Sequence, residues 1–307
     1  MNESIRNSQT PGPSNRPPRI DVNLPLAEGL RRSMLDQIEW AEDAAARIPM
    51  SGEAATRAAE LRRCRKAIKR TRAILRLVRG RADAATIASI DDDLRDAGRR
   101  LSTQRDRDVR LQTIARLLGP EMAATGTTEA SRDRPDAIAE TDRSADLVQA
   151  RMRQLEDRVA DLAIEEISWS RLRRRISRRW IRTRRRLRKE ASRGGDERLH
   201  AVRKACGRLE TQLMLFEGIG DRRVRRRRKR ISRVYETIGE DRDLALALAA
   251  SGEGDDPLRD AIDRRRAELS LVLHRHIGGL RRLRRKAWSM LALAETTRSV
   301  PPRDDPS

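Results

Sequence analysis

The stretch from Leu199 to Phe216 has a spacing of apolar residues that fits one kind of local structure. Its apolar side chains recur every three or four residues, at Leu199, Val202, Cys206, Leu209, Leu213 and Phe216. This period gathers them on one face of an α-helix, so the stretch is predicted to be a helix with one buried side. Basic side chains follow the same period on a neighbouring stripe, at His200, Arg203, Lys204 and Arg208. Such a stripe is ordinarily a solvated face, and anion binding is the alternative.

The same pattern occurs earlier in the chain. When Leu61 to Arg79 is laid on Leu199 to Glu217, seven of nineteen positions are identical. Composition alone would give about one or two identities. With one residue of slippage, a second group also agrees: Leu101, Arg105, Asp106 and Val109 correspond to Ile238, Arg242, Asp243 and Leu246. We therefore predict that a unit of four helices has been duplicated and that the two basic stripes approach a shared surface.

Helical patterns cover most of the chain. The expected helices lie at 26–48, 51–79, 83–118 with an interruption near 101–103, 137–189 with a break near 168–170, 196–217, 222–250 and 257–297. Residues 1–24 and 299–307 lack this periodicity and are expected to be disordered. The folded part is predicted to be an all-α domain at 25–298, with a first helical repeat at 25–118, a linker at 119–136 and a second helical repeat at 137–298.

Charge limits the functions that the chain can have. The net charge is +22, and 63 of the 69 basic residues are arginine. An arginine fork holds two phosphate oxygens at once. A GC-rich genome would favour arginine over lysine, but it does not explain the excess of positive charge, which opposes compaction unless a polyanion offsets it. The basic residues are densest at 171–189, with twelve in nineteen, and at 222–230, with eight in nine.

Several other classes of function lack their usual signatures. Cys64 and Cys206 lie in apolar positions and are interpreted as small buried side chains, and no metal-ligand spacing surrounds them. His274 and His276 are two residues apart and do not share a helical face, so no metal site is expected. No phosphate-binding glycine loop or nucleophile motif occurs, so we expect neither a cofactor nor catalysis. The sequence has no signal peptide or membrane span, and a cytoplasmic, soluble protein is expected.

Two ordered pairs of motifs carry a family resemblance. The motif Leu199-His200-x2-Arg203-Lys204-x3-Arg208, followed by Ile238-Gly239-Glu240-x2-Asp243-Leu244, resembles the second repeat of a CHAD domain, the conserved histidine α-helical domain. The stretch from Arg65 to Arg72, followed by Arg105-Asp106-x2-Val109, is similar to the first repeat. The resemblance covers roughly 26–296. Some members are fused to a CYTH triphosphatase domain, whose ExExK signature is absent here, so the chain resembles a stand-alone member.

The resemblance implies two four-helix bundles related by a pseudo-twofold axis and a basic surface that binds inorganic polyphosphate. The polyphosphate-binding residues expected on this basis are Arg62, Arg65, Lys66, Lys69, Arg70, Arg72, Arg184, His200, Arg203, Lys204 and Arg208. Asp106, Asp243, Arg105 and Arg242 are expected to support or orient them. For the two acids, an ion pair or helix cap is the structural alternative. The chain departs from the family at Arg62, which keeps a cation and is compatible with phosphate binding, and at Gly207 and Glu210. The last two changes predict a weaker or more closely packed second stripe.

Two other functions compete with polyphosphate binding. Nucleic-acid binding draws on the same electrostatic attraction, but one Phe, one Tyr and four Trp are few for stacking on bases. A helical scaffold that coats polyphosphate or other storage granules also fits the predicted fold. Chain-length preference and oligomeric state are left open.

Overall fold

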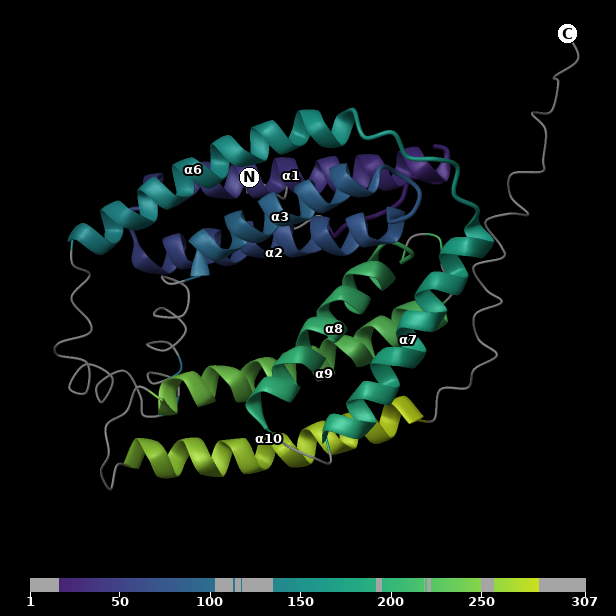
Figure 1. The fold of residues 1–307 in the computed structure, drawn as a ribbon. Coiled ribbons are helices and arrows are strands. Elements are labelled where there is room, and N and C mark those ends of the chain that lie inside the picture. Colours follow the sequence, from purple (N-terminus) through teal and green to yellow (C-terminus); the bar gives the residue numbers. More distant parts are fainter. Residues whose placement is uncertain are drawn as a thin grey trace, which may run out of the picture.

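The computed structural model describes residues 17–102, 113, 117, 135–191, 195–217, 219, 222–249 and 257–281 (Figure 1). All regular structure in these ranges is α-helical. The helices are α1 (Leu26–Met50), α2 (Ala54–Val78), α3 (Ala84–Arg100), α6 (Pro135–Ala160), α7 (Trp169–Ala191), α8 (Asp196–Met214), α9 (Arg222–Leu248) and α10 (Pro257–Arg281). The all-α prediction is confirmed, and the predicted helices at 26–48, 51–79, 196–217 and 222–250 match α1, α2, α8 and α9 to within a few residues.

The helices pack in two groups of neighbours. In the first group α1 lies against α2 and α6, and α3 lies against α2 and α6. In the second, α8 packs on α7 and α9, and α10 packs on α9 and α7. Contacts between α2 and α8 join the groups, and Figure 1 shows the first group as a layer beside the second. The pseudo-twofold relation between two bundles stays a prediction.

The position of α6 differs from the expected division of the chain. The segment after 137 was assigned to the second repeat, yet α6 packs against α1 and α3. The chain passes from one group to the other at 161–168, between α6 and α7. The apolar period of α6 shows which of its sides is buried but not which helices cover that side, so the sequence does not determine the group that α6 joins. Of the expected linker at 119–136, residues 135 and 136 begin α6, and 119–134 lie outside the described residues, as does the tail at 299–307.

The two predicted apolar seams are buried. Leu61, Cys64, Ile68, Leu75 and Val78 of α2 are each at most 1% exposed, and so are Val202, Cys206, Leu209 and Leu213 of α8. Each seam follows the helical period, so burying one face of each helix builds a continuous core. Burial raises the pKa of both cysteine thiols to about 12, which keeps them protonated at neutral pH.

Polar contacts fix α2 against α8 beside this core. The Gln212 side chain donates from Nε2 to the carbonyl oxygen of Ala73 at 2.8 Å, and both atoms are buried. Arg70 is 4% exposed, lies 5.1 Å from the ring centre of Trp40, and has an NH2 group 3.9 Å from the sulfur of Met214. These contacts set the distance between the two helices that carry the predicted basic stripes.

Residues 17–24 depart from the expected disorder. Ile20 is 5% exposed, and its N–H donates to the carbonyl oxygen of Leu215 at 3.3 Å. A methyl carbon of Ile20 lies so close to Gly29 that a Cβ there would be 2.9 Å away. A single isoleucine in a proline-rich stretch forms no periodic pattern, so its burial could not be predicted from the sequence. The apolar area that it buries helps to hold the segment against the core. Residues 1–16 lie outside the described part of the chain.

Within the described residues, no helix is long and apolar enough to cross a membrane.

Candidate functional site

A cleft with a volume of about 920 Å³ lies where the end of α2 meets α7 and α8. Eleven of its fourteen lining residues are arginines, and none is acidic. The arginines are Arg76, Arg79, Arg81, Arg171, Arg174, Arg175, Arg178, Arg179, Arg182, Arg186 and Arg208. The other three lining residues are Gly80, Thr183 and Ala205. A concave surface of this composition is suited to an anion with many oxygen atoms.

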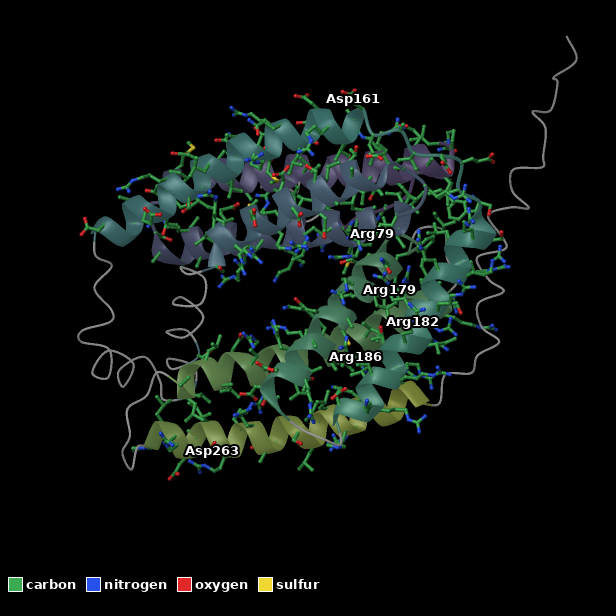
Figure 2. The ribbon with its side chains drawn as sticks, in the orientation of Figure 1. Arg79, Asp161, Arg179, Arg182, Arg186 and Asp263 are labelled. Carbon is green, nitrogen blue, oxygen red and sulfur yellow. The ribbon has the colours of Figure 1, made fainter. Side chains whose placement is uncertain are left out.

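Helix α7 supplies most of these arginines because its two faces differ sharply. The apolar face buries Leu172, Ile176, Trp180 and Leu187. Seven of the twelve basic residues at 171–189 lie on the cleft side, at spacings of three and four. Figure 2 shows Arg179, Arg182 and Arg186 along α7, with Arg79 facing them from the end of α2. The helical period therefore places seven of these arginines on the side of α7 that lines the cleft, where their N–H groups form a row of donors.

Arg175 also holds the end of α2 in place. Its NH1 donates to the carbonyl oxygen of Leu77 at 2.6 Å and its NH2 to that of Arg79 at 2.8 Å. The last carbonyls of a helix have no partner within the helix and carry partial negative charge, so a guanidinium is a favourable cap. The ion pair between Arg81 and Glu165, at 3.0 Å, adds a second link beside it.

The arginines of the cleft disfavour one another's charge. Burial and, to a lesser extent, the charges of Arg208, Arg175, Arg182 and Arg79 together lower the pKa of Arg179 to about 10. Arg179 remains charged at neutral pH, since a pKa near 10 lies well above it. The guanidinium groups that line the cleft therefore repel one another, and a polyanion bound between them would reduce this repulsion.

Among the predicted binding residues, Arg208 lines the cleft and Arg72 lies beside it. Burial lowers the pKa of Arg208, and the charges of Arg186 and Arg72 lower it further. Arg72 donates to Asp91 of α3 at 2.8 and 3.3 Å. The two stripes therefore meet at the cleft from α2 and α8.

A second group of predicted residues gathers around His200. Burial and, to a lesser extent, the charges of Arg242, Lys204, Arg203 and Lys69 together lower the pKa of this imidazole to about 4. These side chains come from α2, α8 and α9. Lys204 lies one helical turn before Arg208, so the group around His200 continues from the cleft along α8. Lys69 of α2 therefore lies close enough to His200 of α8 for its charge to act on the imidazole.

Other predicted residues have structural contacts. The NH1 of Arg65 donates to the carbonyl oxygen of Gly98 at 2.7 Å, and Arg70 is buried against Trp40. Burial lowers the pKa of Lys66, and the charge of Arg70 lowers it further. Arg203 lies 5.2 Å from the ring centre of Tyr235. Arginine is suited to such positions because its flat face packs on aromatic rings.

Two glycines make room for these contacts. A Cβ on Gly207 would lie 2.9 Å from Cε2 of Tyr235, and a Cβ on Gly239 would lie 2.8 Å from NH2 of Arg203. The ring of Tyr235 therefore occupies the space that a side chain at 207 would take. The expectation of closer packing at Gly207 is met by this contact.

The remaining predicted residues lie away from the cleft lining or outside the described residues. Arg62 is exposed on α2, and Arg184 is partly buried on α7, where burial and Arg188 lower its pKa. Arg242 and Asp243 lie in α9. Arg105 and Asp106 fall outside the described part of the chain. Asp91, which is not among the predicted residues, is an acid that contacts two arginines of the cleft, Arg76 and Arg79.

The structure adds ten cleft arginines to the predicted set. They are Arg76, Arg79, Arg81, Arg171, Arg174, Arg175, Arg178, Arg179, Arg182 and Arg186. The available signal was the helical spacing within 171–189, which separates a cleft face from an apolar face. In the described residues, no group of three or more His, Cys, Asp or Glu side chains is placed to hold a metal ion.

Comparisons with known proteins agree with this architecture. The model of the family described as CHAD domain matches residues 39–251. The crystal structure of the CHAD domain from the plant Ricinus communis is similar in fold, with a TM-score of 0.60 and 21% sequence identity. The similarity covers 88% of this chain and 98% of that one. No curated protein matches the sequence significantly.

Proposed function

Because the chain belongs to the CHAD domain family, we propose that it binds inorganic polyphosphate in the arginine cleft, without catalysing its turnover. The observation that carries the proposal is the lining of eleven arginines with no acidic residue. Polyphosphate has phosphate oxygens along its length and no bases to recognise, so a dense row of guanidinium groups supplies the contacts it can use. The family resemblance points to the same ligand.

The ligand is proposed to extend beyond the cleft. Lys204 and His200 follow Arg208 toward the start of α8, and Lys69 approaches them from α2. A linear polyanion that fills the cleft would meet these cations as it leaves. Lys69 of α2, together with His200 and Lys204 of α8, would then bind the part of the chain next to the cleft, with Arg242 and Asp243 at its border.

Nucleic acid is the competing ligand, since counterion release favours any polyanion. The cleft favours polyphosphate because no aromatic residue is among those that line it. Single strands are usually bound by stacking bases on aromatic rings. Coating of polyphosphate granules in the cytoplasm stays a hypothesis, and imaging of a fluorescent fusion with stained granules would test it.

The proposed binding is tested by titrating long-chain polyphosphate, single-stranded DNA and duplex DNA at physiological salt and matched phosphate concentration. Polyphosphate is expected to bind most tightly and to lose affinity steeply as salt rises. Equal affinity for DNA would contradict the specificity. Incubation with tripolyphosphate and Mg²⁺ is expected to release no orthophosphate, and sustained release would contradict the absence of turnover.

Charge reversal locates the site. Replacing Arg179 and Arg182 by Glu is expected to abolish most polyphosphate binding, because it places two carboxylates inside the cleft. The matched control replaces Arg143 on α6 and Arg264 on α10 by Glu, which changes the net charge equally at exposed positions outside the cleft lining. Equal loss of affinity in both variants would show that net charge, and not the cleft, governs binding.

A further inference from the structure

Asp91 is an acid surrounded by arginines at the edge of the cleft. It belongs to α3, and its side chain is 4% exposed. Arg72 grips it with two hydrogen bonds of 2.8 and 3.3 Å. The NH2 group of Arg76 lies 3.5 and 3.4 Å from its two oxygens, and that of Arg79 lies 3.4 Å from Oδ2. One carboxylate therefore joins Arg72 and Arg76 of α2 with Arg79 directly after it, and Arg95 of α3 lies 3.7 Å away.

Helix geometry explains why these three side chains converge. Arg72, Arg76 and Arg79 are spaced by four and three residues, so they lie on one face of α2. That face looks toward α3, which packs on α2 and carries Asp91. Arg76 and Arg79 line the cleft, whereas Arg72 is outside its lining. The carboxylate of Asp91 thus contacts Arg76 and Arg79 from α3 and is not itself part of the cleft lining.

A carboxylate in this position changes what the arginines can do. Three cations on successive turns repel one another, and each long side chain has many rotamers in the absence of a partner. A guanidinium has five N–H donors, and the contacts of Arg76 and Arg79 with Asp91 go through a single terminal nitrogen each. The remaining N–H donors of these two guanidinium groups can serve a ligand in the cleft, which both residues line.

We propose that Asp91 is a positioning residue for the anion site, which holds Arg76 and Arg79 in the orientation that presents their other N–H groups to a phosphate chain. The proposal rests on the proposed function, since it assigns Asp91 a role in the same cleft. Asp91 itself does not touch the ligand, because its oxygens are occupied by the arginines that it orients.

Positioning and simple electrostatics make opposite predictions for Asp91→Asn. The variant gains one positive charge beside the cleft, so attraction between net charges alone predicts tighter binding of a polyanion. Positioning predicts weaker binding, because the amide cannot hold three guanidinium groups. We expect affinity for long-chain polyphosphate to fall about tenfold, the usual size of the loss of one charge-assisted contact.

The matched control is Asp92→Asn. Asp92 is the next residue of α3, its side chain is 59% exposed, and it pairs with Arg95 at 2.6 Å. It carries the same charge change without contact to Arg76 or Arg79 in the ion pairs of the fold. Its affinity for polyphosphate is expected to be unchanged or slightly higher. Circular dichroism and thermal unfolding of all variants establish that binding is compared between folded proteins.

The salt dependence of binding supplies a readout that a structural role alone would not move. The slope of log affinity against log salt counts the cations that contact the polyanion. Asp91→Asn is expected to give a shallower slope than the unchanged chain, since fewer arginines meet the ligand. A slope that is equal or steeper, together with equal or tighter binding, would overturn the positioning role.

Asp91→Glu decides the question if the Asn variant does not fold. It keeps the net charge but moves the carboxylate by one methylene, so weaker binding at unchanged charge is expected. Affinity equal to that of the unchanged chain would overturn the proposal. If the unchanged chain itself does not bind polyphosphate, the proposed function fails, and the two failures are thereby distinguished.

Discussion

Arg175 of α7 donates a hydrogen bond of 2.6 Å to the carbonyl oxygen of Leu77, in the last turn of α2. A second bond from the same guanidinium reaches the carbonyl oxygen of Arg79 at 2.8 Å. One residue thereby caps a helix of the first group from a helix of the second. Since Arg175 also lines the cleft, the shape of the site and the junction between the groups depend on the same side chain.

Replacing Arg175 by Lys is expected to separate its charge from its geometry. Lysine keeps the positive charge but has no planar fork, so it cannot cap both carbonyls at once. The loss of one such hydrogen bond lowers the free energy of unfolding by about 1 kcal/mol. Denaturant unfolding measures this change. The control is Arg174→Lys, the same exchange at an exposed cleft position, and equal destabilisation there would argue against the cap.

Lys69 and Arg70 are neighbours in α2 with opposite environments. Lys69 is exposed, and its charge lowers the pKa of His200. Arg70 is 4% exposed and lies beside Trp40. Lys69→Met and Arg70→Met remove the same charge, but only the first removes it from the surface that the ligand reaches. We expect Lys69→Met to weaken polyphosphate binding severalfold and Arg70→Met to change it little. Calorimetric titration measures both, and the reverse order would place the ligand elsewhere.

Gly207 and Gly239 are expected to respond differently to replacement by alanine. Alanine is favoured over glycine in a helix by about 1 kcal/mol. At Gly207 the new methyl group would meet the rigid ring of Tyr235 at 2.9 Å, so Gly207→Ala is expected to be destabilising and to disturb the stacking of Arg203 on that ring. At Gly239 it would meet the flexible end of Arg203, which can move. Gly239→Ala is therefore expected to be neutral or stabilising in thermal unfolding.

Much of the fold follows from the period of apolar residues. The seam from Leu199 to Phe216 and its counterpart from Leu61 to Val78 are buried or nearly so, because burying one side of a helix leaves few other arrangements. The destination of α6 does not follow from that period. An amphipathic helix shows which of its sides is buried but carries no signal for which neighbour covers it, and the contacts with α1 and α3 decide that.

The site was predicted less completely, for a physical reason. Arg65, Arg70 and Arg203 lie on the basic stripes, yet their partners are Gly98, Trp40 and Tyr235. Arginine serves buried packing and anion binding with the same chemistry, so its sequence position cannot separate the two roles. The cleft also requires a turn of α2 to face a stripe of α7, which only the tertiary fold provides.

The protonation state of His200 is expected to depend on whether the ligand is bound. Its pKa lies near 4 in the fold, below the ordinary value of 6.5, because of burial and the charges of Arg242, Lys204, Arg203 and Lys69. Between these two pH values the unfolded chain binds a proton at this residue and the folded chain does not. The contribution of His200 to stability is therefore present above pH 6.5 and declines as pH falls toward 4. His200→Gln is expected to reduce this decline.

A polyanion bound beside His200 would oppose the field of the surrounding cations. Negative phosphates next to the imidazole would raise its pKa, so we expect a proton to be taken up on binding between pH 4 and 6.5, and affinity for polyphosphate to rise as pH falls through this window. Titration calorimetry at one pH in buffers of different ionisation enthalpy measures the uptake directly. His276, whose pKa is also lowered by burial, remains in His200→Gln and serves as an internal background. If that variant takes up as many protons as the unchanged chain, His200 does not face the bound phosphates, and the ligand path stops at the arginine cleft.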